Sequence, residues 1–206
     1  MDNLNPFLSD INNSYQIERK LFPLKINNSN IPCFIVPIRP EFAMHLFQAN
    51  ISETDLFGGD TNLLFNKENV YYRSAKQKIL ESNSRILWYI SKGSNKYSDT
   101  MTITTSSYLS EYEISTPKAL YNKNKRLGVF QWKDVLNTAN RDLDNEIMAF
   151  NFELNENFKH PITRGELNPI YQKYRKKDFF ASPTCLRITE DMYFEIYSIG
   201  NRIKYE

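Results

Sequence analysis

The stretch CFIVPIRPEFA, residues 33–43, decides how this sequence folds. Residues 33–38 form a nearly continuous apolar run, which is typical of a buried strand. Pro40 comes two residues after this run, and proline suits the first position of a helix. Phe42 and Leu46, four residues apart, would then lie on one apolar face of a short helix over 41–48. The sequence therefore predicts a buried strand that leads directly into a helix.

Further apolar and β-branched runs predict more strands, and threonines with the right neighbours predict more helices. The strands are expected over 70–73, 86–90, 101–114 (one bent strand or two), 129–136 and 146–154. Helices are expected to begin after Thr116, Thr163 and Thr189, each of which suits a helix N-cap. The strands do not alternate with long helices. The pattern therefore predicts an α+β fold, a curved mixed or antiparallel β-barrel with short flanking helices.

The amino-acid composition limits the functions that the chain could have. Of the 206 residues, 41% are hydrophobic and 24% are charged, so the chain can bury a core. The net charge is only +2, so nucleic-acid binding would depend on local basic clusters. Two cysteines and two histidines without a CxxC pair do not predict a zinc site, and no cofactor is expected. No apolar run approaches the length of a membrane span, which predicts a cytoplasmic protein with reduced thiols.

The chain is predicted to divide into an N-terminal extension, residues 1–30, and one domain, residues 31–206. The extension is rich in Asn and Ser with a small apolar patch at 21–24, which suggests an extended segment partly ordered against the domain.

Several motifs together resemble a known family. Residues 33–43, with NVYYRS at 69–74 and RILWYIS at 85–91, resemble the opening of PUA-like domains, the ASCH group in particular. With LGVFQWKDV at 127–135, EIMAF at 146–150 and SPT at 182–184, they resemble a module at the C-terminal end of bacterial proteins described as GNAT-type acetyltransferases.

This resemblance covers about residues 31–200. It implies a PUA-like fold and its usual partners, which are RNA or modified bases in DNA or RNA. Thirty residues before the first strand are too few for an acetyltransferase, and no Gly-rich turn could hold a pyrophosphate, so acetyl-CoA binding is not expected.

Arg39 and Arg73 each end a predicted strand and are expected to lie side by side, where they could hold a phosphate. The alternative is a pair of ordinary surface arginines, with Arg39 paired to Glu41. The aromatic residues that could stack on a base are Tyr71, Trp88, Tyr89 and Trp132, although core packing is the alternative for each. The remaining candidates for nucleic-acid contact are Lys133, Arg126 and Ser182.

Two basic clusters could follow a phosphate backbone if they lie on the rim of one cleft, although such clusters are more often solvated faces. They are 118–126 and 173–177. Relatives in the ASCH group include nucleases and small amidohydrolases that use Lys, Thr and Glu. For such chemistry the candidate catalytic residues are Lys67 and Glu68, with Glu41 nearby. Asp142 and Asp144 could hold a magnesium ion but more plausibly form a solvated turn.

The favoured function is a nucleic-acid-binding module that accepts an unstacked or modified base. The alternatives are a ribonuclease or amidohydrolase on the same fold, and a regulatory subunit of a toxin–antitoxin or phage-defence assembly. In the last case residues 1–30 would contact the protein partner.

Overall fold

The computed structural model describes residues 10–47, 68–75, 79–93, 100–127, 129–179 and 184–202. Its strands are β1 (Cys33–Ile38), β2 (Glu68–Ser74), β3 (Ser84–Ile90), β4 (Thr102–Ser115), β5 (Ile147–Thr163) and β6 (Leu186–Ile188). Its helices are α2 (Ile11–Lys20), α3 (Pro40–Phe47), α5 (Pro117–Asn124), α6 (Trp132–Thr138), α7 (Arg164–Arg175) and α8 (Glu190–Asn201).

The six strands form one mixed sheet in the order β2-β5-β4-β3-β1-β6. Only β1 and β3 pair in parallel, and every other neighbouring pair is antiparallel. The predicted α+β class and the curved mixed sheet are confirmed. The sheet does not close into a barrel, because β2 and β6 lie at opposite edges.

Strand β1 lies inside the sheet, between β3 and β6, and its sequence is apolar on both faces. Phe34, Val36 and Ile38 face one core cluster, and Cys33 and Ile35 face the other. Both clusters pack tightly, since Phe34 and Val36 are 0% exposed and Cys33 and Ile35 are 1% exposed. Burial of both faces explains why the run shows no alternation of polar and apolar residues.

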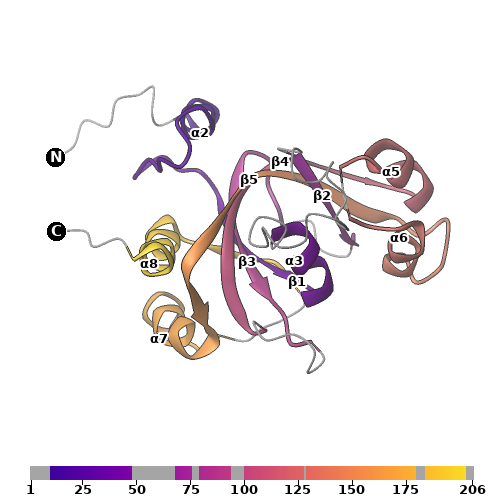
Figure 1. Cartoon of the computed structure of the whole chain (residues 1–206). Helices are drawn as coiled ribbons and strands as arrows, with labels where there is room; N and C mark the ends of the chain where they lie inside the picture. Colours follow the sequence, from indigo (N-terminus) through magenta and orange to yellow (C-terminus); the bar gives the residue numbers. More distant parts are fainter. Residues whose placement is uncertain are drawn as a thin grey trace, which may run out of the picture.

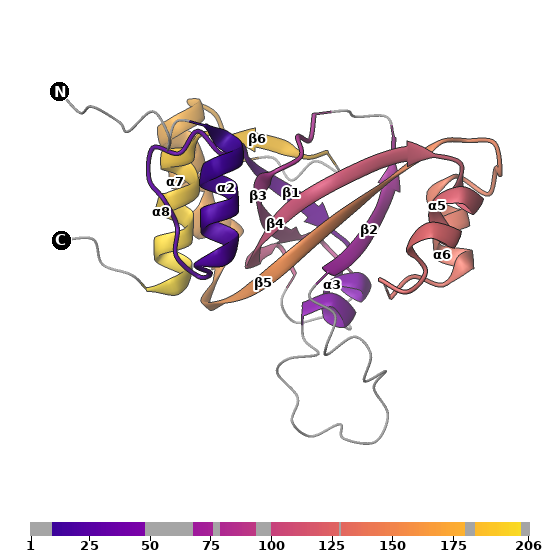
Figure 2. The same cartoon turned by 90° about the horizontal axis from the view of Figure 1, so that it is seen from above.

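The two core clusters separate the helices into two groups. Helices α3, α5 and α6 bury apolar residues in the cluster that contains Trp88, whereas α7 and α8 pack in the cluster that contains Tyr89. Figures 1 and 2 show α7 and α8 at one end of the molecule and α5 and α6 at the other. In both views α2 lies toward the same end of the molecule as α7 and α8.

The predicted strand over 129–136 is wrong. Residues 132–138 form helix α6, and the backbone N–H of Gln131 donates to the Asp134 carboxylate at 3.1 Å. This contact satisfies one of the N–H groups that a helix start leaves without a partner. The aromatic and β-branched residues of the run favoured a strand, but Val135 packs into the core from a helix instead.

Strand β4 agrees with the predicted bent strand over 101–114, whereas β5 is longer than the sequence predicts. Residues 102–115 form one strand whose pairing with β5 shifts register at three places. Strand β5 continues through 163, past the expected end at 154. Leu154 has a φ of 54°, a left-handed conformation that marks an irregularity in the strand. Pro161 is tolerated because only β4 pairs with this part of β5.

Part of the N-terminal region is helical rather than extended. Residues 11–20 form α2, whose N-cap Asp10 accepts a hydrogen bond from the backbone N–H of Asn12 at 2.8 Å. Ser14, Tyr15 and Glu18 are buried against the rest of the chain. Among the described residues, no helix is both long enough and apolar enough to cross a membrane.

Candidate nucleic-acid interface

Four side chains from three parts of the chain form what we call the strand-end cluster: Arg39, Tyr71, Arg73 and Cys185. Arg39 lies between β1 and α3, Tyr71 and Arg73 are two residues apart on β2, and Cys185 directly precedes β6. Period-two alternation places Tyr71 and Arg73 on the same face of the sheet. The Arg73 guanidinium donates to the Cys185 sulfur. The cluster therefore joins the end of β1 to both edge strands.

Both arginines act electrostatically on the Tyr71 hydroxyl. Burial raises the pKa of Tyr71 to about 12, against the opposing effects of the Arg73 charge, a backbone hydrogen bond from Arg39 and the Arg39 charge. Burial likewise raises the pKa of the Cys185 thiol to about 11, although the Arg73 charge lowers it. Both groups are therefore neutral at pH 7. The charge of the cluster is that of its arginines, reduced by one nearby carboxylate.

That carboxylate belongs to Glu41, which forms an ion pair with Arg39. The pair is solvent-exposed, because 66% of the Arg39 side chain and 32% of the Glu41 side chain are accessible. The Arg39 guanidinium also lies 5.3 Å from the centroid of the Phe42 ring. Exposed pairs of this kind contribute little to stability. An anion could therefore replace Glu41 as the partner of Arg39 at small cost.

Three of the aromatic candidates are buried. Tyr71 is 6% exposed, Trp88 is 0% exposed and Tyr89 is 1% exposed. Trp88 donates from its indole nitrogen to Ser107 Oγ at 2.9 Å, and Tyr89 packs against Phe179 on the opposite face of the sheet. The described structure thus places these three rings in the core and leaves no face of Trp88 or Tyr89 for a base.

Trp132 is the fourth aromatic candidate and is partly exposed. It begins α6, where its ring lies 5.4 Å from the ring of Tyr121. Lys133 follows it and is exposed, and Arg126 is exposed in the turn after α5. Helix α6 packs against β2. The backbone N–H of Val70 on β2 also donates to Leu127 in that turn, at 3.0 Å. These three candidates therefore lie on elements that adjoin edge strand β2.

The structure does not test the proposed catalytic pair, because it does not describe Lys67, and the same holds for Ser182 as a candidate for nucleic-acid contact. Both lie outside the described residues, whereas Glu68 is exposed at the first position of β2. No three His, Cys, Asp or Glu side chains gather as metal ligands within the described ranges.

The two basic clusters do not border one cleft. The 118–126 cluster is on and after α5, and the 173–177 cluster is at the end of α7, at the opposite end of the sheet (Figure 1). Several of these charges already have partners. Lys123 pairs with Glu113 at 2.5 Å, and Lys173 pairs with Glu195 at 2.6 Å.

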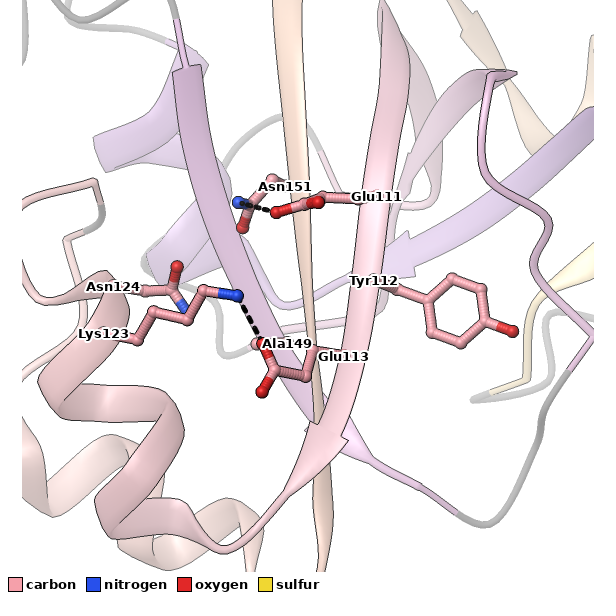
Figure 3. A pocket seen from close by; sticks show the side chains of 7 residues that line it. All are labelled: Glu111, Tyr112, Glu113, Lys123, Asn124, Ala149 and Asn151. Atoms are coloured by element: carbon pink, nitrogen blue, oxygen red, sulfur yellow. Dashed lines mark hydrogen bonds and ion pairs between the residues drawn. The ribbon is translucent and has the colours of Figure 1, made fainter.

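The α5 cluster borders a small hollow between α5, β4 and β5 (Figure 3). Its volume is about 10 Å³, room for about one water molecule. Besides Lys123 it is lined by Glu111, Glu113 and Asn151, and Asn151 donates to Glu111 at 3.4 Å. Two carboxylates beside a single lysine do not favour a phosphate.

Two members of the site could not be found by sequence reasoning. Cys185 has no motif around it that points to Arg73, 112 residues away. Phe42 was expected only to pack in the core, yet it also lies beneath the Arg39 guanidinium. The two arginines of the cluster could be picked out from the sequence, because each follows or ends an apolar run.

Comparison with known proteins bears on the fold. No protein-family model matches the chain, and no curated protein matches it. A crystal structure of a mutant ASCH protein from Zymomonas mobilis is 14% identical, with a TM-score of 0.58 over 82% of this chain and 99% of that one. The structure titled "ASCH from Zymomonas mobilis" is 13% identical, with a TM-score of 0.57 over 81% of this chain and 94% of that one.

The N-terminal domain of Staphylothermus marinus McrB is also similar, at 13% identity and a TM-score of 0.44 over 82% of this chain and 94% of that one. The likeness to the acetyltransferase-linked module remains a prediction. The likeness to the two Zymomonas mobilis structures shows the fold: the chain has an ASCH-type, PUA-like fold.

Proposed function

We propose that this chain is a nucleic-acid-binding module that holds a phosphate group at the strand-end cluster. The observation that carries the proposal is that two arginines at strand ends, Arg39 and Arg73, lie close enough to the buried Tyr71 hydroxyl for both charges to act on it. Arginine presents a planar fork of donors that matches phosphate oxygens. Here the Arg39 side chain is largely exposed, and the Arg73 guanidinium is held by its hydrogen bond to Cys185. The anchored arginine would orient the phosphate, and the exposed one would close over it.

The base next to that phosphate would stack on Trp132. This ring is partly exposed, and its helix packs against the strand that carries Arg73. Lys133 and Arg126 would add charge along the same edge. Stacking on an aromatic side chain contributes about 1–3 kcal/mol per base and requires an unpaired base. We therefore expect single strands to bind more tightly than a duplex.

The test is a set of titrations with labelled single-stranded RNA, single-stranded DNA and duplex of one sequence, at two salt concentrations. For single strands, log K should fall with log[salt] by about 0.7 for each phosphate contacted. Strong, salt-sensitive binding to one single strand would support the proposal and identify its ligand. If no nucleic acid binds at low salt, the proposal is wrong.

The other functions remain predictions. A ribonuclease or amidohydrolase would use Lys67 and Glu68. Glu68 lies opposite Glu153 in the pairing of β2 with β5, and its charge acts on Arg19. A regulatory subunit would contact its partner through residues 1–30. Part of that segment, including Glu18, is already buried within this chain.

A further inference from the structure

A lysine of the N-terminal segment lies inside a ring of aromatic side chains. The Lys25 ammonium is 4.9 Å from the ring centroid of Tyr108, 5.0 Å from that of Tyr197 and 5.2 Å from that of Phe22. Only 4% of the Lys25 side chain is exposed. An ammonium within about 6 Å of an aromatic face is attracted by the ring quadrupole, and the attraction grows when water is excluded. Three such rings surround this one charge.

One carboxylate completes the enclosure. Lys25 Nζ lies 3.3 Å from Glu156 Oε2, and the Tyr197 hydroxyl donates to both oxygens of Glu156 at 2.8 Å. Lys25 also donates to the backbone carbonyl of Pro23 at 3.3 Å. A positive charge therefore has an anion, a carbonyl dipole and aromatic faces around it.

Phe22 belongs to the same segment as Lys25, and the other three walls come from separate elements of the domain. Tyr108 belongs to β4, Glu156 to β5 and Tyr197 to α8. The Tyr108 hydroxyl donates to the buried Glu18 at 2.7 Å, which fixes the orientation of its ring. Such a second layer of contacts keeps a site in its binding geometry.

The segment that carries Lys25 is held in place by hydrogen bonds to the backbone of the next residue, Ile26. The backbone N–H of Ile26 donates to Glu18 at 2.6 Å, and Arg85 donates to the Ile26 carbonyl at 2.8 Å. Both backbone polar groups of Ile26 are therefore bonded to members of the buried Arg85–Glu18 ion pair. These backbone contacts of Ile26 hold the segment in place, so the position of Lys25 does not depend on its own side chain alone.

We propose that Tyr108, Tyr197, Phe22 and Glu156 form a binding site for a primary ammonium group, which Lys25 fills from within the chain. The site goes beyond the nucleic-acid proposal and does not depend on it, because none of its residues belongs to the strand-end cluster. Its ligand class is a short alkylammonium ion, the chemistry of the lysine side chain that occupies it.

The test removes the internal ligand and supplies an external one. Lys25→Ala lacks three methylene groups and the ammonium, and n-propylammonium chloride supplies the same atoms. The variant should melt at a temperature lower by about 5 °C. Increasing n-propylammonium should restore at least half of that loss in a saturable way. The wild-type protein, whose site is full, should show no such response.

Three comparisons decide the outcome. Sodium chloride at equal ionic strength tests for general salt effects, and 1-propanol, a neutral molecule of the same length, tests for simple filling of space. Lys25→Met keeps most of the stem without the charge, and it should also melt below the wild type. The proposal is overturned if wild type and Lys25→Ala respond alike, if 1-propanol restores as much, or if Lys25→Met is as stable as the wild type.

Discussion

Arg85 on β3 and Glu18 on α2 form an ion pair closed off from solvent, with both side chains 0% exposed and Arg85 Nε 3.1 Å from Glu18 Oε2. Glu190, at the start of α8, is a second partner of the same guanidinium at 2.9 Å. The described part of the predicted N-terminal extension is therefore joined to β3 by a buried ion pair, in addition to its apolar contacts.

Breaking the pair should be strongly destabilising. Glu18→Ala leaves the buried Arg85 with only part of its compensation, and loss of one partner of a buried pair costs about 3–5 kcal/mol. Urea unfolding followed by circular dichroism measures the change. Glu18→Leu combined with Arg85→Met should cost less than Glu18→Ala alone, because the buried guanidinium is removed with its buried partner and the remaining carboxylate, Glu190, is partly exposed. Lys123→Ala, which breaks the exposed pair with Glu113, is the control and should change little.

Gly200 in α8 should not tolerate a methyl group. A Cβ at this position would lie 2.6 Å from Phe158 Cγ and 2.7 Å from Phe158 Cε2, well inside van der Waals contact. Alanine normally favours a helix over glycine by about 1 kcal/mol. Here overpacking of about 1–3 kcal/mol should outweigh that gain. Gly200→Ala should therefore lower the free energy of unfolding.

Gly165 in α7 is the matched control for this prediction. Its added Cβ would meet only Thr163 Oγ1, at 3.8 Å, so Gly165→Ala should be neutral or stabilising. Gly200→Ala should also recover stability when Phe158→Leu is introduced with it. Equal behaviour of the two glycine variants in thermal melts would show that the contact with Phe158 is not what limits position 200.

Both cysteines should resist modification in the folded protein. Burial raises the pKa of Cys33 to about 12 and that of Cys185 to about 11. The reactive form of cysteine is the thiolate. Thiol-reactive disulfide reagent at pH 8 should therefore label neither residue until denaturant is added, when it should label both. Rapid labelling of one thiol in the native protein would contradict this.

The raised pKa values of the two cysteines also determine how the stability of the protein should change with pH. Unfolded thiols lose their protons near pH 9, whereas the folded ones keep theirs until about pH 11–12. The unfolded state thus binds fewer protons in this window, and stability should fall as the pH rises from 9 to 11. Replacing both cysteines with alanine should flatten this part of a plot of unfolding free energy against pH.

The two tryptophans should respond differently to ligand. Trp88 is 0% exposed, whereas Trp132 is partly exposed. Binding of a single strand should quench the fluorescence of Trp132, because a base stacks on its ring. The quenching should vanish in Trp132→Phe and persist in a variant with Trp88→Phe that remains folded. Quenching that survives Trp132→Phe would exclude this ring as the stacking surface.

The sequence predicts an element of this fold well when the contacts that form the element are close together in the chain. Strand β1 and the helices α7 and α8 were predictable, because an apolar run and threonine N-caps act over a few residues. Thr163, for example, accepts from the Glu166 backbone at 3.3 Å, the capping contact that its spacing indicates. Helix α6 was mispredicted because tertiary packing of Val135 overrode the strand preference of its run.

The candidate site was only partly predictable for the same reason. Arg39 and Arg73 stood out because each ends an apolar run. The neighbouring sequence does not show whether an aromatic side chain lies in the core or on the surface. The buried Trp88 and Tyr89 could therefore not be told apart from the partly exposed Trp132. The cage around Lys25 joins residues that are up to 175 positions apart in sequence (Phe22 to Tyr197), and no spacing rule connects them.

The most direct test of the central claim compares the affinity of single-stranded RNA and DNA for the wild type, Arg39→Ala, Arg73→Ala and Lys173→Ala, by fluorescence anisotropy over a range of salt. Each arginine variant should bind more weakly, and each should lower the salt slope by about 0.7. Lys173→Ala removes one charge at the other end of the sheet and should bind as the wild type does. If all three variants lose the same affinity, or if only Lys173→Ala loses any, the strand-end cluster does not hold the phosphate.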